Sequence, residues 1–88
     1  MPMFIISYDL NKQKNYPKLW EELKRLGCVR ALESVWIGKL TGTADTVIKH
    51  LTQYVDGDDS LIVSEAKSET TALKRPFEGA REFISQRA

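Results

Sequence analysis

The first predicted strand, residues 3–9, is apolar on both of its faces for most of its length. Alternate side chains of a strand point to opposite faces, so the two sets can be separated by position. One face carries Phe4, Ile6 and Tyr8, and the other carries Met3, Ile5, Ser7 and Asp9. Because neither face is polar throughout, we expect a central strand covered by helices on one side and by another layer, such as a second subunit, on the other.

Two later segments repeat apolar residues at the spacing of an amphipathic helix. In the first segment they recur at i, i+3, i+4, i+7 and i+10, as Tyr16, Leu19, Trp20, Leu23 and Leu26. Pro17 in the first turn and Gly27 just past the end are the boundary residues expected of such a helix. The second segment follows a break at residues 41–43, and its apolar stripe is Ala44, Val47, Ile48, Leu51, Tyr54 and Val55.

The remaining segments are predicted to be extended. Residues 28–40 read as one long strand or two short ones, with a bend or bulge near Glu33 and Ser34. Residues 56–59 predict a turn, and residues 61–63 a short buried strand. The order β-α-β-β-α-β with right-handed crossovers predicts an α+β ferredoxin-like fold, in which an antiparallel sheet carries both helices on one face.

The length of 88 residues predicts one ferredoxin-like domain over residues 1–67 and a C-terminal extension over residues 68–88. The extension contains a possible strand or a short helix after Pro76 and Phe77. It could pack on its own sheet, cross to a partner subunit or fray. A chain of this size buries only roughly 60 to 65% of its unfolded surface, so we expect a homodimer to supply further stability.

Charge and cysteine content narrow the partners only slightly. Thirteen basic and twelve acidic residues give a net charge of +1, so nucleic-acid binding would need a local patch. The single cysteine, Cys28, excludes an intrachain disulfide and fits a reducing cytoplasm. The sequence contains no apolar run of the roughly 18 residues that a membrane span needs and no glycine-rich phosphate loop. We therefore expect a cytoplasmic protein with no membrane partner.

Contacts to RNA or DNA are predicted at a few positions. Lys12, Lys14 and Arg30 are the candidate phosphate-binding residues. Trp36 could stack on bases or pack on another chain, although core packing is the expected role of both Trp20 and Trp36.

Asp9 is the leading candidate for chemistry because it stands where the first strand ends. The ladder hydrogen bonds of a strand would fix this carboxylate, so it could ligate a metal or act as a general base. The competing interpretation is that Asp9 caps the following loop by accepting hydrogen bonds from backbone amides. One carboxylate alone is a poor magnesium site, so a metal role needs a second Asp9 from another subunit.

Other polar residues carry weaker signals. Ser34 could donate its hydroxyl to a phosphate or a scissile group, but no histidine is placed to activate it as a nucleophile. His50, the only histidine, is expected on the surface of the second helix. The aspartates of residues 56–59 resemble the start of a calcium loop, yet Lys67 stands at the twelfth position where glutamate is required, so we expect a solvated turn.

Three segments, taken in order, resemble the Cas2 family of CRISPR-associated proteins and the broader group that contains the VapD ribonuclease toxins. They are residues 5–10 (IISYDL), residues 27–40 with the run LESVW, and residues 55–63 (VDGDDSLIV). The resemblance implies a ferredoxin-like homodimer whose sheets face each other and whose tails add a strand to the partner's sheet. It further implies that Asp9 and its mate hold a divalent metal, Mg²⁺, for phosphodiester hydrolysis, with Ser34 close to that site.

The resemblance leaves three functions open. The first is a magnesium-dependent endonuclease acting on RNA or DNA. The second is a non-catalytic adaptor dimer that binds nucleic acid or a protein, such as an integrase-type partner, and the third is a VapD-like ribonuclease toxin. Leu32 stands where the family usually has glutamine, and the loop after Asp9 lacks an arginine-rich helix, so the chain is most similar to stand-alone relatives.

Overall fold

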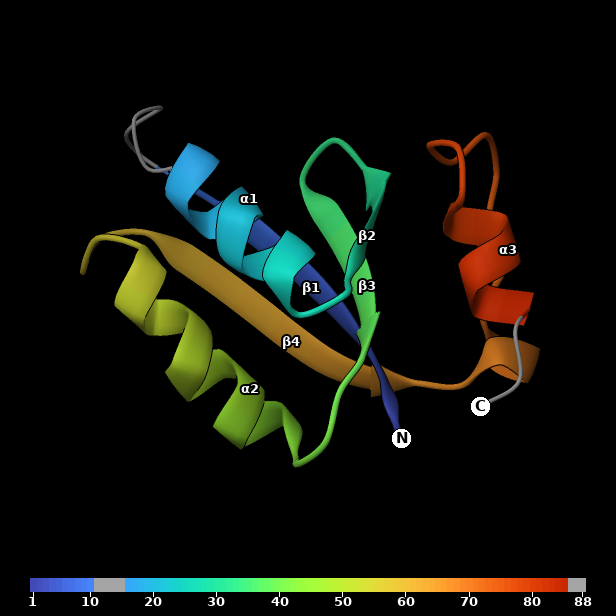
Figure 1. The fold of residues 1–88 in the computed structure, drawn as a ribbon, viewed down its shortest axis with the longest axis horizontal. Helices are drawn as coiled ribbons and strands as arrows, with labels where there is room; N and C mark the ends of the chain where they lie inside the picture. Colours follow the sequence, from blue (N-terminus) through green and yellow to red (C-terminus); the bar gives the residue numbers. More distant parts are fainter. Residues whose placement is uncertain (11–15, 86–88) are drawn as a thin grey trace.

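The computed structural model describes residues 1–10 and 16–85. Its four strands form one sheet in the order β2-β3-β1-β4, and each neighbouring pair is antiparallel. The strands are β1 (Met3–Asp9), β2 (Val29–Leu32), β3 (Val35–Lys39) and β4 (Ser60–Ala66), and the helices are α1 (Tyr16–Arg25), α2 (Ala44–Leu51) and α3 (Ala80–Ser85). Two 3₁₀ turns, η2 (Thr52–Tyr54) and η3 (Ser68–Thr70), follow α2 and β4. This arrangement confirms the predicted ferredoxin-like α+β fold (Figure 1).

The main core lies between the sheet and the pair α1 and α2. It contains the even-numbered side chains of β1, as the alternation predicts, and the apolar stripes of both helices. Trp36 is buried here, so its predicted core role is confirmed. The buried members of this core are Phe4, Ile6, Tyr8, Leu10, Leu19, Leu23, Cys28, Trp36, Val47 and Leu51.

Backbone signals in the sequence explain where α1 ends and where α2 begins. Gly27 has a φ of +83°, which glycine adopts without strain, and it follows α1. The amide of Gly27 donates to the carbonyl of Lys24, and that of Cys28 to the carbonyl of Leu23, each at 3.0 Å, which is the Schellman pattern of a helix C-terminus. At the start of α2, Thr43 accepts from the amide of Thr46 and its own amide donates to the Thr46 hydroxyl, so the two residues form a reciprocal cap.

Residues 28–40 form two strands, which resolves the alternative left open by the sequence. Glu33 and Ser34 make the turn between β2 and β3, where the bend was expected. The register shifts between Arg30 and Leu32, and this bulge leaves Ala31 buried on the sheet face opposite α1 and α2. The turn is joined to β1 because the amide of Tyr8 donates to the carbonyl of Ser34 at 3.2 Å.

The C-terminal segment lies against the second face of the sheet in the same chain. The amide of Phe77 donates to the carbonyl of Ala31 at 2.8 Å, and Lys39 Nζ donates to the carbonyl of Phe83 at 3.1 Å. Figure 1 shows α3 beside β2, away from α2. A second small core forms where this helix meets the sheet, and its buried members are Met3, Ala31, Ile37, Ala80 and Ile84.

On the second face, the start of β4 and the end of β1 are left exposed by the residues that the structure describes. Ile62 is 65% exposed there, although the sequence predicted a buried strand around it. Its neighbours Leu61 and Val63 point to the main core, as the alternation requires. Ile62 is therefore an exposed apolar residue between Ser60 and Ser64 on the outer face of β4. Among the described residues, no helix is long and apolar enough to cross a membrane.

Candidate functional site

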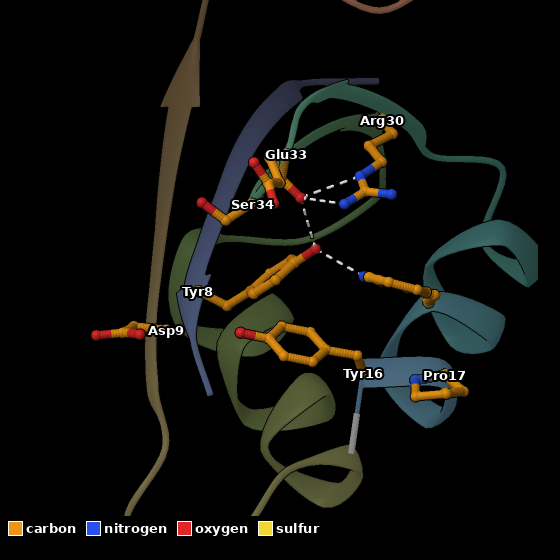
Figure 2. Close-up of a pocket in the computed structure, with 8 residues that line it drawn as sticks. Tyr8, Asp9, Tyr16, Pro17, Arg30, Glu33 and Ser34 are labelled. Atoms are coloured by element: carbon orange, nitrogen blue, oxygen red, sulfur yellow. Dashed lines mark hydrogen bonds between the residues drawn. The ribbon is translucent and has the colours of Figure 1, made fainter. Parts of the chain in front are cut away.

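Asp9 is the last residue of β1, and its side chain is exposed. The ladder places Asp9 opposite Ser60 on β4, on the same face as Ser7 and Ile62. Figure 2 shows the Asp9 carboxylate directed away from the rings of Tyr8 and Tyr16. The carboxylate is thus held by a central strand and presented at the end of the uncovered part of the sheet.

Ser34 lies near the same end of β1, as the resemblance implied. The β2–β3 turn that carries it is fixed at two points, since its Ser34 carbonyl accepts from the Tyr8 amide and its Glu33 carbonyl accepts from the Tyr8 hydroxyl at 3.2 Å. Asp9 and Ser34 line one cavity of about 570 Å³. The two candidate residues from the sequence therefore contribute to one site.

Three aromatic residues, Tyr8, Tyr16 and Trp20, also line this cavity, and sequence reasoning had assigned them only to the first strand, the helix or the core. The Tyr8 hydroxyl accepts from Nε1 of Trp20 at 2.6 Å and from Nε1 of Trp36 at 3.2 Å. The ring of Tyr16 lies 5.7 Å from that of Tyr8 and 5.5 Å from that of Trp20, measured between centroids. The signal that could have revealed this cluster is the chain position of Tyr16, at the start of a helix that follows the Asp9 strand.

Among the residues that the structure describes, Arg30 is the basic residue that lines the cavity. Its Nε and Nη2 donate to the Glu33 carbonyl at 3.0 and 2.5 Å. Its guanidinium carbon lies 4.6 Å from the ring centroid of Trp20 and 5.3 Å from that of Phe77, which is cation–π geometry. The other two predicted phosphate-binding residues, Lys12 and Lys14, lie outside the described residues.

The acidic turn of residues 56–59 lies at the same end of the sheet as Asp9, because β4 begins at Ser60 opposite Asp9. Within the described residues, Asp56, Asp58 and Asp59 form a group whose potential ligand atoms all lie within 4.8 Å of one another. Asp59 Oδ2 also accepts from the Asp56 amide at 2.7 Å, which stabilises the turn. Asp9 is not a member of this group.

A second polar cluster connects α1 to α2 away from the cavity. Glu22 is only 5% exposed, and Arg25 donates to both of its carboxylate oxygens, at 2.7 and 2.6 Å. His50 Nε2 contacts Glu22 Oε2, so the histidine expected at the surface has a carboxylate partner on the other helix. The hydrogen bonds from Arg25 lower the pKa of Glu22 from 4.5 to about 2, against the opposing effect of burial. This cluster explains how a glutamate can occupy a buried helix position.

A comparison with models of protein families identifies the family of this chain. No solved structure was found to match the chain. A family model described as CRISPR associated protein Cas2 matches residues 1–72, which include all four strands, α1 and α2. The match covers Asp9, Ser34 and the acidic turn, and it confirms the resemblance inferred from the three sequence segments. The chain therefore belongs to the Cas2 family of CRISPR-associated proteins.

Proposed function

We propose that the protein is a homodimeric, metal-dependent endonuclease that hydrolyses phosphodiester bonds of RNA or DNA. Two copies of Asp9, one from each subunit, hold the metal. The observation that carries this proposal is the position of Asp9, an exposed carboxylate fixed by a central strand beside an uncovered apolar residue, Ile62. Family membership supports it as well.

The uncovered part of the sheet is suited to a second copy of the chain. In a two-fold contact the same surface is used by both subunits, so residues near the axis meet their own counterparts. Ile62 is 65% exposed, and burying it against the partner would contribute about 1 to 2 kcal/mol per subunit. Ser7, Asp9 and Ser64 share its face of the sheet, so pairing through Ile62 places the two Asp9 residues on one interface.

The residues present fit a magnesium ion. Mg²⁺ prefers oxygen ligands and keeps several waters, so two exposed carboxylates with the remaining positions open suit it. The acidic turn of residues 56–59 adds negative charge at the same end of the sheet, which favours a cation there. When bound, such an ion lowers the pKa of a water and neutralises charge on the phosphate. Asp9 holds the ion, Ser34 donates a hydrogen bond to a phosphate oxygen, and Arg30 orients the substrate backbone.

A non-catalytic adaptor dimer is the second candidate function, and one observation favours it. Asp9 does not belong to the one group of three carboxylates found among the described residues of its own chain, which is the acidic turn. Without a close mate in the dimer, Asp9 would be left as a structural residue at the strand end. The uncovered sheet face would then serve to bind a protein or a nucleic acid.

The test compares Asp9→Asn with Asp45→Asn, a charge-matched control on the exposed surface of α2. Light scattering gives the oligomeric state, and cleavage of labelled RNA and duplex DNA is measured with Mg²⁺ and with EDTA. We expect a dimer in all three proteins, and Mg²⁺-dependent cleavage that is lost only in Asp9→Asn. Cleavage that persists in Asp9→Asn would refute the assignment, and a dimer with no Mg²⁺-dependent activity would favour the adaptor.

A further inference from the structure

The cavity beside the end of β1 has the size and the lining of a small-ligand site. Its volume is about 570 Å³, within the range of roughly 300 to 1,000 Å³ typical of such sites. Its walls come from the end of β1, the first turns of α1 and the β2–β3 hairpin. We propose that it binds one unpaired nucleotide, free or at the end of a strand, with the base against Tyr16 and the phosphate on Arg30. This proposal does not depend on a metal at Asp9.

Aromatic rings supply a stacking surface for the base. Tyr16 and Trp20 lie 5.5 Å apart with their ring planes inclined by 34°, and Tyr16 is only partly buried. Figure 2 shows the Tyr16 ring beside that of Tyr8, on the side of the cavity formed by α1. Tyr8 itself is fixed by the indole hydrogen bonds that its hydroxyl accepts. The Tyr16 ring, which lies against this fixed Tyr8 ring, can stack on any base, because every base has a π face.

Arg30 supplies a cation that is already oriented. The Glu33 carbonyl and the rings of Trp20 and Phe77 hold its guanidinium in place, so little side-chain entropy remains to be lost on binding. Within residues 1–10 and 16–85, no carboxylate forms an ion pair with Arg30. Its charge is therefore available to a ligand. Because Nε and Nη2 already donate to the Glu33 carbonyl, a phosphate would be bound by the Nη1–Nη2 edge of the guanidinium, which also matches two oxygens.

The acidic residues of the rim restrict where a phosphate can lie. Glu33 and Asp9 both line the cavity, and their carboxylates repel an anion. Figure 2 shows Asp9 directed away from Arg30, so the phosphate is accepted on the Arg30 side, with the base toward α1. Because the cavity is lined by one cation and two carboxylates, we expect weak binding, with a dissociation constant of about 0.1 to 1 mM at low ionic strength.

The experiment titrates adenosine monophosphate into metal-free protein in the presence of EDTA and follows the two tryptophan indole signals by NMR. Trp20 lines the cavity, whereas Trp36 is buried in the core, so the Trp20 signal should shift more. Adenosine and inorganic phosphate, each lacking half of the ligand, should bind at least fivefold more weakly. A single-stranded trinucleotide with a 5′-phosphate shows whether the cavity binds a strand end or a free nucleotide. Tighter binding than that of the mononucleotide indicates a strand end, and equal binding indicates a free nucleotide.

Three variants locate the ligand. Arg30→Gln should raise the dissociation constant about tenfold, Arg30→Lys should raise it less, and Tyr16→Leu should weaken adenosine monophosphate without weakening inorganic phosphate. Arg81→Gln, an exposed residue of α3, removes the same charge outside the cavity and should leave binding unchanged. Thermal unfolding shows whether each variant is folded. If Arg30→Gln does not fold, Arg30→Lys and Tyr16→Leu still test the proposal.

Two results would overturn the proposal: no shift of the Trp20 signal at 10-fold the expected dissociation constant, or wild-type affinity in folded Arg30 and Tyr16 variants. Neither result bears on the nuclease assignment, because the titration uses no metal and measures no cleavage. Equally, nucleotide binding by a protein that cleaves nothing would refute the nuclease and retain this site.

Discussion

Neutralising Glu22 should lower the stability of the fold at pH 7, and this loss of stability should disappear at low pH. Glu22 is 5% exposed and its carboxylate accepts two hydrogen bonds from Arg25 on α1 and contacts His50 on α2. The Glu22→Gln variant keeps the size of the side chain but removes its charge. It leaves one acceptor oxygen where the carboxylate had two, so both the bidentate pair with Arg25 and the link between the helices are weakened.

The magnitude follows from the pKa of Glu22, which is lowered from 4.5 to about 2. At 1.36 kcal/mol per pKa unit, this difference corresponds to an upper limit of about 3.4 kcal/mol. The partners are exposed, Arg25 by 65% and His50 by 38%, so solvent screening reduces the value. We expect Glu22→Gln to lose about 1 to 2 kcal/mol at pH 7, which is roughly 4 to 16 °C in melting temperature.

The sign of the pH dependence follows because the pKa of Glu22 is lower in the folded protein than in the unfolded chain. The contribution of Glu22 is fully present above pH 4.5 and is lost as the pH falls toward 2, where the folded protein also takes up the proton. Urea unfolding, followed by tryptophan fluorescence, gives the stability of both proteins between pH 2 and pH 7. Their difference should shrink across this interval. Glu21→Gln, the exposed neighbour on the same helix, is the control and should stay within about 0.5 kcal/mol of wild type.

A difference that persists unchanged at pH 2, or no difference at pH 7, would refute this reasoning. The first result would mean that the glutamine disturbs packing rather than charge. The second would mean that the cost of burying the carboxylate cancels the gain from its partners.

Three further changes test other parts of the structure. Gly38→Ala would place a Cβ against Cys28 Sγ in the core, so we expect a loss of about 1 to 3 kcal/mol in urea unfolding, largely restored in the double variant with Cys28→Ala; equal stability of the single and double variants would contradict the contact. Thr43→Ala should cost about 1 kcal/mol because the cap of α2 loses its acceptor, whereas Thr43→Ser should retain most of it, as measured in the same way. Ile62→Asp should convert the proposed dimer to a monomer in light scattering, because it puts a charge on the exposed face of β4, and it should lower monomer stability by no more than about 1 kcal/mol; a dimer that persists would exclude this face as the interface.

Most of the fold could be predicted because its signals are local. The stripes at Leu19, Leu23, Val47 and Leu51 and the glycine at 27 are consequences of helix geometry that sequence spacing alone reveals. The strand that ends in Asp9 was likewise defined by its own alternation.

The features that could not be predicted all depend on contacts between distant segments. The partnership of Glu22 with His50 joins residues 28 positions apart, and the bond between Tyr8 and the turn at Glu33 joins residues 25 apart. No periodicity encodes such pairs, since they depend on how the helices lie across the sheet. For the same reason the cavity around Arg30 was visible in the sequence only as one scattered basic residue.

The bulge in β2 and the tail that bonds to it also affect how chains can assemble. A sheet grows by adding strands to its edges, and the edges among the described strands are β2 and β4. On β2, the bulge at Ala31 breaks the ladder, and the Phe77 amide already occupies the carbonyl of that residue. β4 is a strand of seven residues, and no backbone hydrogen bond from outside the sheet reaches it within residues 1–10 and 16–85. Strand addition is therefore favoured at one edge only, so that any growth by this route would stop at two chains instead of continuing into a fibre.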